Sequence, residues 1–450
     1  MNRLPADLAA DLADLPAAFT LADARVPACL LADGAWSADR EGLAAVDIAV
    51  ADGRVAALTS ASGATQPDPA RLDLAGRLVL PGFVDIHTHL DKGFIWQRAP
   101  NPDGSFDGAM AAVAADRAAN WSEEDIARRF DFALRCAHAH GTVAIRTHLD
   151  SEGPRAATAW RVFAAMREAW RGRIELQAVG LIPIDSVMDD TLFATLIELI
   201  RAHGGLLGSY TYATPNLVPG LERLFATAER WGLALDLHVD ERDRNGRGLF
   251  EIATLARERR FEGPILAGHC CALSLKAAEE IDRTLDLVAQ AGIGVVSLPM
   301  CNLYLQDRAP GRTPRWRGVT LLHEMKARGI PVMVASDNTR DPFYAYGDLD
   351  LAEVYREATR IAHLDHPAAD WPAVVSRAPA QWIGLEAGRL APGTAADLVL
   401  FPARSLNEWL ARPLGARGVL RRGRLLDAAV PDYAELDDAM QTRKAPRHGP

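Results

Sequence analysis

The sequence of 450 residues predicts an α/β fold, a (β/α)8 TIM-like barrel with a small β-sandwich formed by the N- and C-terminal segments. Two observations carry this prediction. The middle of the chain alternates eight apolar, strand-like runs with amphipathic segments rich in Ala, Leu, Glu and Arg. Both ends instead contain short strands separated by glycine-containing turns.

The two ends use the same hairpin pattern. Between Val46 and Gly82, short alternating strands are joined by Asp-Gly and Ala-Gly turns, and similar strands follow Gly388. Because two β-rich ends flank a long middle, we expect them to form one small sandwich together. The expected parts are the N-terminal sandwich half, the barrel, and the C-terminal sandwich half with a tail, at residues 1–78, 79–384 and 385–450.

The barrel strands are expected where apolar runs of strand length end in turn or helix signals. These runs lie at residues 84–90, 142–149, 174–183, 206–212, 234–239, 265–270, 294–299 and 331–336. Helices are expected between them, for example at Glu123–Ala139 and Leu275–Gln290. Eight successive strand-then-helix units are the number that closes a barrel.

Composition excludes several functions. The hydrophobic share of 49% and charged share of 24% are typical of a soluble globular protein. The net charge of −10 argues against a nucleic-acid surface, and no apolar run is long enough for a membrane span. Five cysteines without C-x-x-C spacing, and no signal-peptide pattern, favour a cytoplasmic protein. We expect a small-molecule substrate as the partner, with a homo-oligomer left open.

Histidines gather at one end of the expected strands. His87 and His89 stand two apart on the first strand, so both point to one face, about 6.7 Å apart, and can hold one metal ion. The chain has 12 histidines, and five of them end expected strands: His87, His89, His148, His238 and His269. Those strand ends meet at the mouth of a barrel. For His148, a core role and a supporting role beside the metal ligands are equally open.

Two carboxylates accompany these histidines. His238 can join the metal, and Glu241, three residues later, can reach a metal-bound water as general acid and base if the chain turns after Val239. The alternative for Glu241 is a surface acid that starts a helix. Asp337 closes the eighth strand as a carboxylate ligand or, alternatively, as a helix N-cap. His269 is the candidate that orients the water or the substrate.

The lysines limit the number of metals. The chain has four, Lys92, Lys276, Lys326 and Lys444, and none ends the fourth strand. A second ion bridged by a modified lysine at that strand is therefore excluded. Three histidines, an aspartate and a water suit one divalent transition metal per chain, Zn²⁺ or Fe²⁺.

This pattern resembles the amidohydrolase superfamily, and within it bacterial cytosine deaminases and their relatives. The likeness runs from about Asp47 to Phe401 and includes PGFVDIHTHLDK, RTHLD, HVDE, GHC and the long block from Asn302 to Tyr344. The resemblance implies that His87, His89, His238 and Asp337 are the metal ligands. It implies that Glu241 carries the proton, that His269 contacts the attacking water, and that Phe343 lies against the substrate ring.

The sequence departs from cytosine deaminases in the substrate pocket. The ring-binding glutamine expected after the third strand has no counterpart among Pro183, Ile184 and Asp185, and Asn338 stands where an aspartate is expected. The motif HLDK, which contains Lys92, resembles the corresponding motif of relatives that act on N-substituted triazines. The candidate substrate-binding residues are therefore Lys92, Pro183, Ile184, Asp185, Asn338 and Phe343.

The expected function is a metal-dependent hydrolytic deaminase. It would release ammonia from an aminated N-heterocycle, a cytosine-like pyrimidine or a related ring, through a metal-bound hydroxide. The alternatives are hydrolysis of another C–N bond, such as a cyclic amide or an N-alkyl amino-triazine, and a non-catalytic binding protein. Without the amide, we expect cytosine to be a secondary substrate unless Asp185 replaces that partner.

Overall fold

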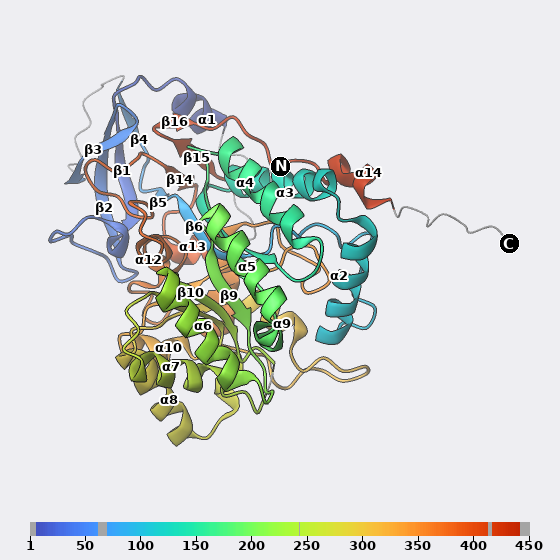
Figure 1. Cartoon of the computed structure of the whole chain (residues 1–450). Helices are drawn as coiled ribbons and strands as arrows, with labels where there is room; N and C mark the ends of the chain where they lie inside the picture. Colours follow the sequence, from blue (N-terminus) through green and yellow to red (C-terminus); the bar gives the residue numbers. More distant parts are fainter. Residues whose placement is uncertain (1–5, 62–69, 243, 413–415, 442–450) are drawn as a thin grey trace. The chain divides into compact units, whose positions relative to one another are not determined.

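The computed structural model describes residues 6–61, 70–242, 244–412 and 416–441 (Figure 1). The chain forms two compact units, one that includes both ends of the sandwich region and one that includes most of the middle. The first unit comprises Met1–Asp85, Ala137–Ala144 and Asp350–Val430, and the second comprises Ile86–Cys136, Ile145–Leu349 and Pro431–Pro450. The boundaries expected from the sequence, after residues 78 and 384, stay predictions.

The first unit contains a mixed sheet. Its strands run in the order β16-β15-β14-β5-β1-β2-β3, with β4 beside β1. Strand β5 pairs antiparallel with β14, and this pairing places Leu80 opposite Val399, so both ends of the chain contribute to the same sheet. The strands are β1 (Phe19–Pro27), β2 (Leu43–Ala51), β3 (Arg54–Ser60), β4 (Arg71–Asp73), β5 (Leu78–Pro81), β14 (Leu398–Phe401), β15 (Gly418–Arg421) and β16 (Arg424–Leu425). The division of this sheet into a two-layered sandwich stays a prediction.

The hairpin between β2 and β3 shows how the sequence sets the register. Ala51 pairs with Arg54, so the loop between the strands is the two residues Asp52 and Gly53. Both have positive φ, 51° and 72°, as a tight turn that matches the strand twist requires. The Asp-Gly turn predicted from the sequence is therefore present.

Eight parallel strands form a nearly closed barrel. They are hydrogen-bonded in sequence order, from β6 through to β13. The last neighbours meet through a parallel bridge between Thr88 and Asp337, where the Asp337 amide donates to the His87 carbonyl at 2.9 Å. The strands are β6 (Phe83–Thr88), β7 (Thr142–Asp150), β8 (Glu175–Leu181), β9 (Leu206–Tyr210), β10 (Leu235–Val239), β11 (Ile265–His269), β12 (Gly294–Ser297) and β13 (Val332–Val334). The predicted α/β barrel is confirmed.

Helices connect the strands. Those of the second unit and its boundary are α2 (Phe106–Asn120), α3 (Glu123–Ala139), α4 (Ala156–Ala169), α5 (Asp190–His203), α6 (Leu217–Trp231), α7 (Gly248–Glu258), α8 (Ala278–Gln290), α9 (Pro299–Leu305), α10 (Leu322–Ala327) and α14 (Asp437–Met440). Those of the first unit are α1 (Ala6–Ala13), α11 (Leu351–Ala362), α12 (Arg377–Trp382) and α13 (Leu406–Ala411).

The helix bounds agree with the sequence at α3 and differ at α8. Helix α8 begins at Ala278, later than the expected start at Leu275, because Cys271–Leu275 forms a 3₁₀ turn first. Helix α5 shows strong local signals at both ends: Asp189 accepts hydrogen bonds from the first-turn amides, and Gly204 ends the helix with φ 66°. Among the described residues, no helix has the length and apolar character needed to cross a bilayer.

Candidate active site

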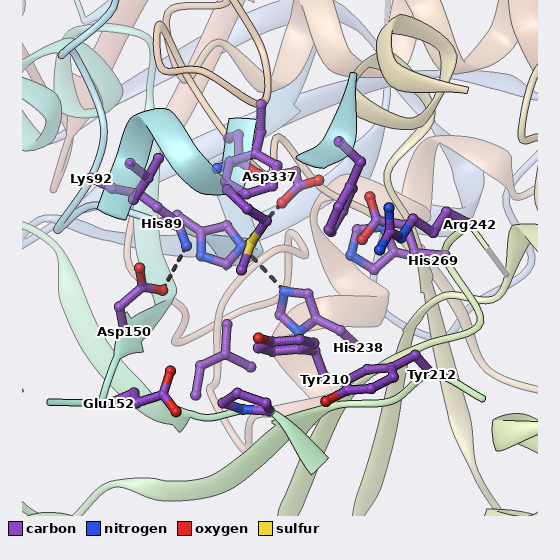
Figure 2. A pocket seen from close by; sticks show the side chains of 18 of the residues that line it. His89, Lys92, Asp150, Glu152, Tyr210, Tyr212, His238, Arg242, His269 and Asp337 are labelled. Carbon is purple, nitrogen blue, oxygen red and sulfur yellow. Dashed lines mark hydrogen bonds and ion pairs between the residues drawn. The ribbon is translucent and has the colours of Figure 1, made fainter. Parts of the chain in front are cut away.

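Four donor atoms converge at the carboxyl end of the barrel. His87 lies on β6, His89 just after it, His238 on β10, and Asp337 just after β13. The Nε2 atom of His238 is 3.2 Å from Nε2 of His87 and 3.2 Å from Nε2 of His89. Asp337 Oδ1 is 3.2 Å from His89 Nε2 and 3.7 Å from His87 Nε2. Figure 2 shows His89, His238 and Asp337 pointing toward one another.

These atoms fit a single divalent transition metal. Four ligands at ordinary zinc bond lengths in a tetrahedral site lie about 3.3 Å apart, close to the separations observed. Burial lowers the pKa of His87, His89 and His238 well below the usual range, which favours the neutral form that binds metals. Within the described residues, both Asp337 oxygens are buried without a hydrogen bond, which is costly for a carboxylate unless a cation compensates.

His148 packs against His87, one of these four candidate metal ligands. Its ring centroid is 4.0 Å from that of His87, and its Nε2 atom is 3.1 Å from Asp236 Oδ1. The other Asp236 oxygen accepts a hydrogen bond from Arg146 at 2.8 Å. This buried Arg146–Asp236 pair fixes the His148 ring against His87, which agrees with the supporting role that the sequence left open.

Glu241 lines the cavity beside this centre. The chain turns after Val239, as this placement requires, because Asp240 adopts a left-handed φ of 45° and its carboxylate accepts from the Gly248 and Leu249 amides of α7. Burial, partly opposed by the charge of His269, raises the pKa of Glu241. A carboxyl with a raised pKa can take up and return a proton nearer neutral pH than an exposed one.

Asn302 connects Glu241 with His269. It is fully buried on α9, and its Nδ2 atom lies 3.0 Å from His269 Nδ1 and 3.4 Å from Glu241 Oε1. Asn302 Oδ1 is also near, at 3.3 Å from His269 Nδ1, and the shorter Nδ2 contact corresponds to the tautomer in which Nδ1 accepts and Nε2 carries the proton. Nε2 is buried and has no hydrogen-bond partner among the described residues, so in this tautomer its N–H is available for a bound molecule.

Left-handed backbone conformations occur at three of these strand ends, as they do at other positions in the chain. Asp240, His269 and Asp337 have φ values of 45°, 67° and 65°. A non-glycine residue in this region costs about 1–3 kcal/mol and persists where the surroundings enforce it. The strain therefore coincides with the residues that follow or end β10, β11 and β13, where the candidate chemical groups are held.

A cavity of about 320 Å³ opens onto the centre. Its lining includes four of the candidate substrate-binding residues, Lys92, Pro183, Asn338 and Phe343. Ile184 and Asp185 do not line it. Ile184 is fully buried, and Asp185 accepts hydrogen bonds from Tyr212 at 2.7 Å, Thr214 at 2.8 Å and Asn216 at 2.8 Å. Because both Asp185 oxygens accept these hydrogen bonds, Asp185 is not placed to replace the side-chain amide of the missing ring-binding glutamine.

Asp341 orders the wall formed by Asn338 and Phe343. Its carboxylate accepts from Asn338 Nδ2 at 2.7 Å and from the Phe343 amide at 2.8 Å. Burial raises the pKa of Asp341 to about 7. The Lys92 ammonium lies 5.4 Å from the centroid of the Phe343 ring, so this wall combines an aromatic face with a positive charge.

Lys92 belongs to a buried charge network. It donates to Asp150 Oδ1 at 2.7 Å, and Arg117 donates to Asp150 Oδ2 at 3.1 Å. Burial alone would lower the pKa of Lys92, but the charges of Asp150 and Asp91 outweigh it and raise the value. Lys92 is therefore a charged donor at the cavity wall.

Sequence reasoning missed several cavity residues. Glu152, Tyr210, Tyr212 and Arg242 line the cavity (Figure 2). Asn302 does not line it but bonds to two of its chemical groups. Tyr210 and Tyr212 follow the rule that strand ends face the mouth, and that rule could have identified them. Glu152 stands two residues after β7, as Tyr212 does after β9, so the same rule could have identified it; Asn302 carried no such signal, because it stands on a short helix after its strand.

Comparison with known proteins identifies the family. A family model described as "Amidohydrolase family" matches residues 71–198 and 200–426. The chain belongs to the amidohydrolase family. The membership expected from the sequence is confirmed, and the chain is an enzyme of the kind that acts on C–N bonds.

Individual relatives narrow the comparison. The chain is 52% identical to the pterin deaminase of Rhizobium rhizogenes over 423 residues, which cover 94% of this chain and 96% of that protein. Its fold is similar to that of 5-methylcytosine deaminase from Klebsiella pneumoniae, with 24% identity, a TM-score of 0.79, and coverage of 91% and 97%. It is also similar to N-isopropylammelide isopropylaminohydrolase from Burkholderia multivorans, with 27% identity, a TM-score of 0.72, and coverage of 91% and 98%.

Proposed function

We propose that this protein is a metal-dependent hydrolytic deaminase of pterins. The observation that carries the chemistry is that the half-buried carboxyl of Glu241 lines one cavity together with His89, His238 and Asp337. The fourth donor, His87 Nε2, lies 3.2 Å from His238 Nε2. The ring class is supported by the similarity to a pterin deaminase, which extends over 96% of that protein. The reaction replaces the ring amino group with oxygen from water and releases ammonia.

The donor group would hold one Zn²⁺ or Fe²⁺ ion. When bound, such an ion supplies Lewis-acid activation of a water molecule, whose pKa it can lower to about 7. One ion per chain is supported by the end of β9, the fourth barrel strand. It carries Tyr210 and no lysine that could be modified to bridge a second ion. His148 and Asp236 would hold the ligand His87 in place from behind.

Glu241 would move the protons. It takes a proton from the attacking water and delivers it to the ring nitrogen next to the carbon that carries the amino group. Asn302 holds the Glu241 carboxylate at 3.4 Å, and the same amide orients His269 so that its Nε2–H faces the reacting oxygen. A second proton transfer allows ammonia to leave.

The cavity walls would hold the ring. Phe343 offers a face for stacking, and Lys92 offers a positive donor for a ring oxygen or nitrogen. A cavity of about 320 Å³ is at the small end of ligand sites, which suits a fused bicyclic ring with a small substituent. This agrees with the expectation, from the missing amide, that a ring larger than cytosine is preferred.

Deamination has one specific competitor. The similarity to N-isopropylammelide isopropylaminohydrolase supports removal of an alkylamine from a triazine as a second candidate function. A substrate panel separates deamination from removal of an alkylamine. Enzyme of known metal occupancy is assayed with pterin, cytosine and N-isopropylammelide, and the ammonia and isopropylamine released are measured. We expect the highest kcat/KM for pterin, with ammonia as the amine released. Turnover of N-isopropylammelide alone would refute the proposal.

A further inference from the structure

The carboxylates that line the cavity differ in whether a positively charged side chain pairs with them. Asp150 pairs with Lys92 and Arg117, and Asp107 pairs with Arg242 at 2.7 Å. Of the other acidic lining residues, Asp337 belongs to the metal-binding group and Glu241 is the proposed proton carrier. The fifth is Glu152, and within the part of the chain that the structure describes no cation pairs with it.

Glu152 is held in position by a single hydrogen bond. It follows β7 in the chain and is half-buried, and its Oε1 atom accepts from Ser186 Oγ at 2.7 Å. Among the described residues, its second oxygen has no partner. In Figure 2 the side chain extends toward the pocket, on the side away from His269 and near Tyr210. Burial, followed by the charge of Glu152, raises the pKa of the Tyr210 hydroxyl, in agreement with this proximity.

The position of Glu152 matters because this chain lacks the ring-binding glutamine, with its side-chain amide, that was expected after the third strand. Pro183 lines the cavity but has no polar side-chain atom, and Asp185 is held away by three hydrogen bonds. Ser186, on the same 3₁₀ turn as Asp185, instead points its hydroxyl at Glu152. The segment after β8 therefore orients an acceptor that comes from the end of β7.

We propose that Glu152 is a specificity-determining residue that accepts a hydrogen bond from a ring N–H of the substrate. The inference rests on the proposed function, because the ring N–H in question belongs to pterin. It is the amide N3–H, which oxidised and reduced pterins share. An ionised carboxylate is an acceptor only, so it favours rings that present a donor at this wall and disfavours rings that present an acceptor. Ser186 is its positioning residue.

The size of the effect follows from the charge of the acceptor. Removing one hydrogen bond to a charged group should lower kcat/KM for pterin about 10- to 150-fold. Glu152→Leu removes the acceptor, whereas Glu152→Gln keeps one neutral oxygen and should lose less. Ser186→Ala should lose less than Glu152→Leu, since the carboxylate is freed but still present.

The test combines these variants with a change in the substrate. Wild type, Glu152→Leu and Glu152→Gln are assayed by ammonia release with pterin and with 3-methylpterin, which lacks the N3–H. A ring that is not turned over is measured as a competitive inhibitor instead. Glu175→Leu, at the exposed start of β8 and outside the cavity lining, is the matched control. Metal content and circular dichroism of each variant establish that it is folded and loaded.

Two results decide the proposal. We expect Glu152→Leu to lose at least tenfold on pterin and less than threefold on 3-methylpterin, with the control unchanged. An equal loss on both rings, or no loss on pterin, would overturn the role of Glu152 while leaving pterin deamination intact. If wild type does not deaminate pterin, the proposed function fails by itself. The variants are then compared on the panel ring that is turned over and on its N-methyl form, with the same criteria.

Discussion

Replacement of Asn302 tests how the proton carrier is held. Asn302 is fully buried, and its amide contacts His269 Nδ1 at 3.0 Å and Glu241 Oε1 at 3.4 Å. Asn302→Leu keeps a similar volume but removes both contacts. It leaves the Glu241 carboxylate free to rotate, and His269 loses the hydrogen-bond partner of its Nδ1 atom. Neither residue is among the proposed metal ligands, so metal binding should survive.

The expected loss can be worked from these two contacts. A hydrogen bond to a charged group is worth about 1.5–3 kcal/mol and one to a neutral group about 0.5–1.5 kcal/mol. Together they amount to about 2–4.5 kcal/mol, which corresponds to a decrease in kcat of about 30- to 2,000-fold. The larger values apply if both contacts tighten in the transition state, because the 3.4 Å distance to Glu241 is longer than an ideal hydrogen bond.

The assay is steady-state ammonia release with metal analysis of the same samples. Asn216→Leu is the matched control, since Asn216 also bonds a carboxylate, that of Asp185 at 2.8 Å, but does not line the cavity. We expect a large decrease in kcat for Asn302→Leu at full metal occupancy and little change for the control. A kcat within threefold of wild type would refute the role of Asn302. A parallel loss of metal would show that the variant acts on the centre instead.

Three further predictions concern Glu241 and the metal. Glu241→Gln should retain its metal and lose at least about 10² in kcat, because an amide cannot carry the proton; unchanged turnover would identify another residue as the proton carrier. Since burial raises the pKa of Glu241 and the base must be ionised, kcat/KM should fall as the pH drops through a value above 4.5; a flat profile down to pH 4 would contradict this. Purified protein should contain about one divalent transition metal per chain, and His238→Ala should lose it; a requirement for two ions would refute the single-metal centre.

The barrel and the convergence of His87, His89, His238 and Asp337 could be predicted from the sequence, because both follow from strand periodicity. The eight apolar runs correspond to the eight barrel strands, and an i, i+2 spacing places His87 and His89 on one face. The carboxyl ends of parallel strands meet at one mouth, so residues 149 positions apart, His89 and His238, could be expected together.

The substrate pocket could not be predicted in the same way. Asp185 was a candidate by its position after the third strand, but a 3₁₀ turn directs its carboxylate to Tyr212, Thr214 and Asn216. Glu152 and Asn302 stand in irregular or short elements, where no periodicity fixes the direction of a side chain. Their contacts depend on residues that are 34 and 61 positions away, Ser186 and Glu241.

The most direct test of the proposed function is the amount of ammonia that the metal-loaded enzyme releases per pterin consumed. Pterin loss is followed by its absorbance and ammonia is measured in the same samples, with cytosine in parallel. We predict one ammonia per pterin and a kcat/KM for pterin that exceeds that for cytosine by about 5- to 150-fold, the cost of one unpaired buried polar group. Pterin that stays intact while cytosine is deaminated efficiently would contradict the proposal.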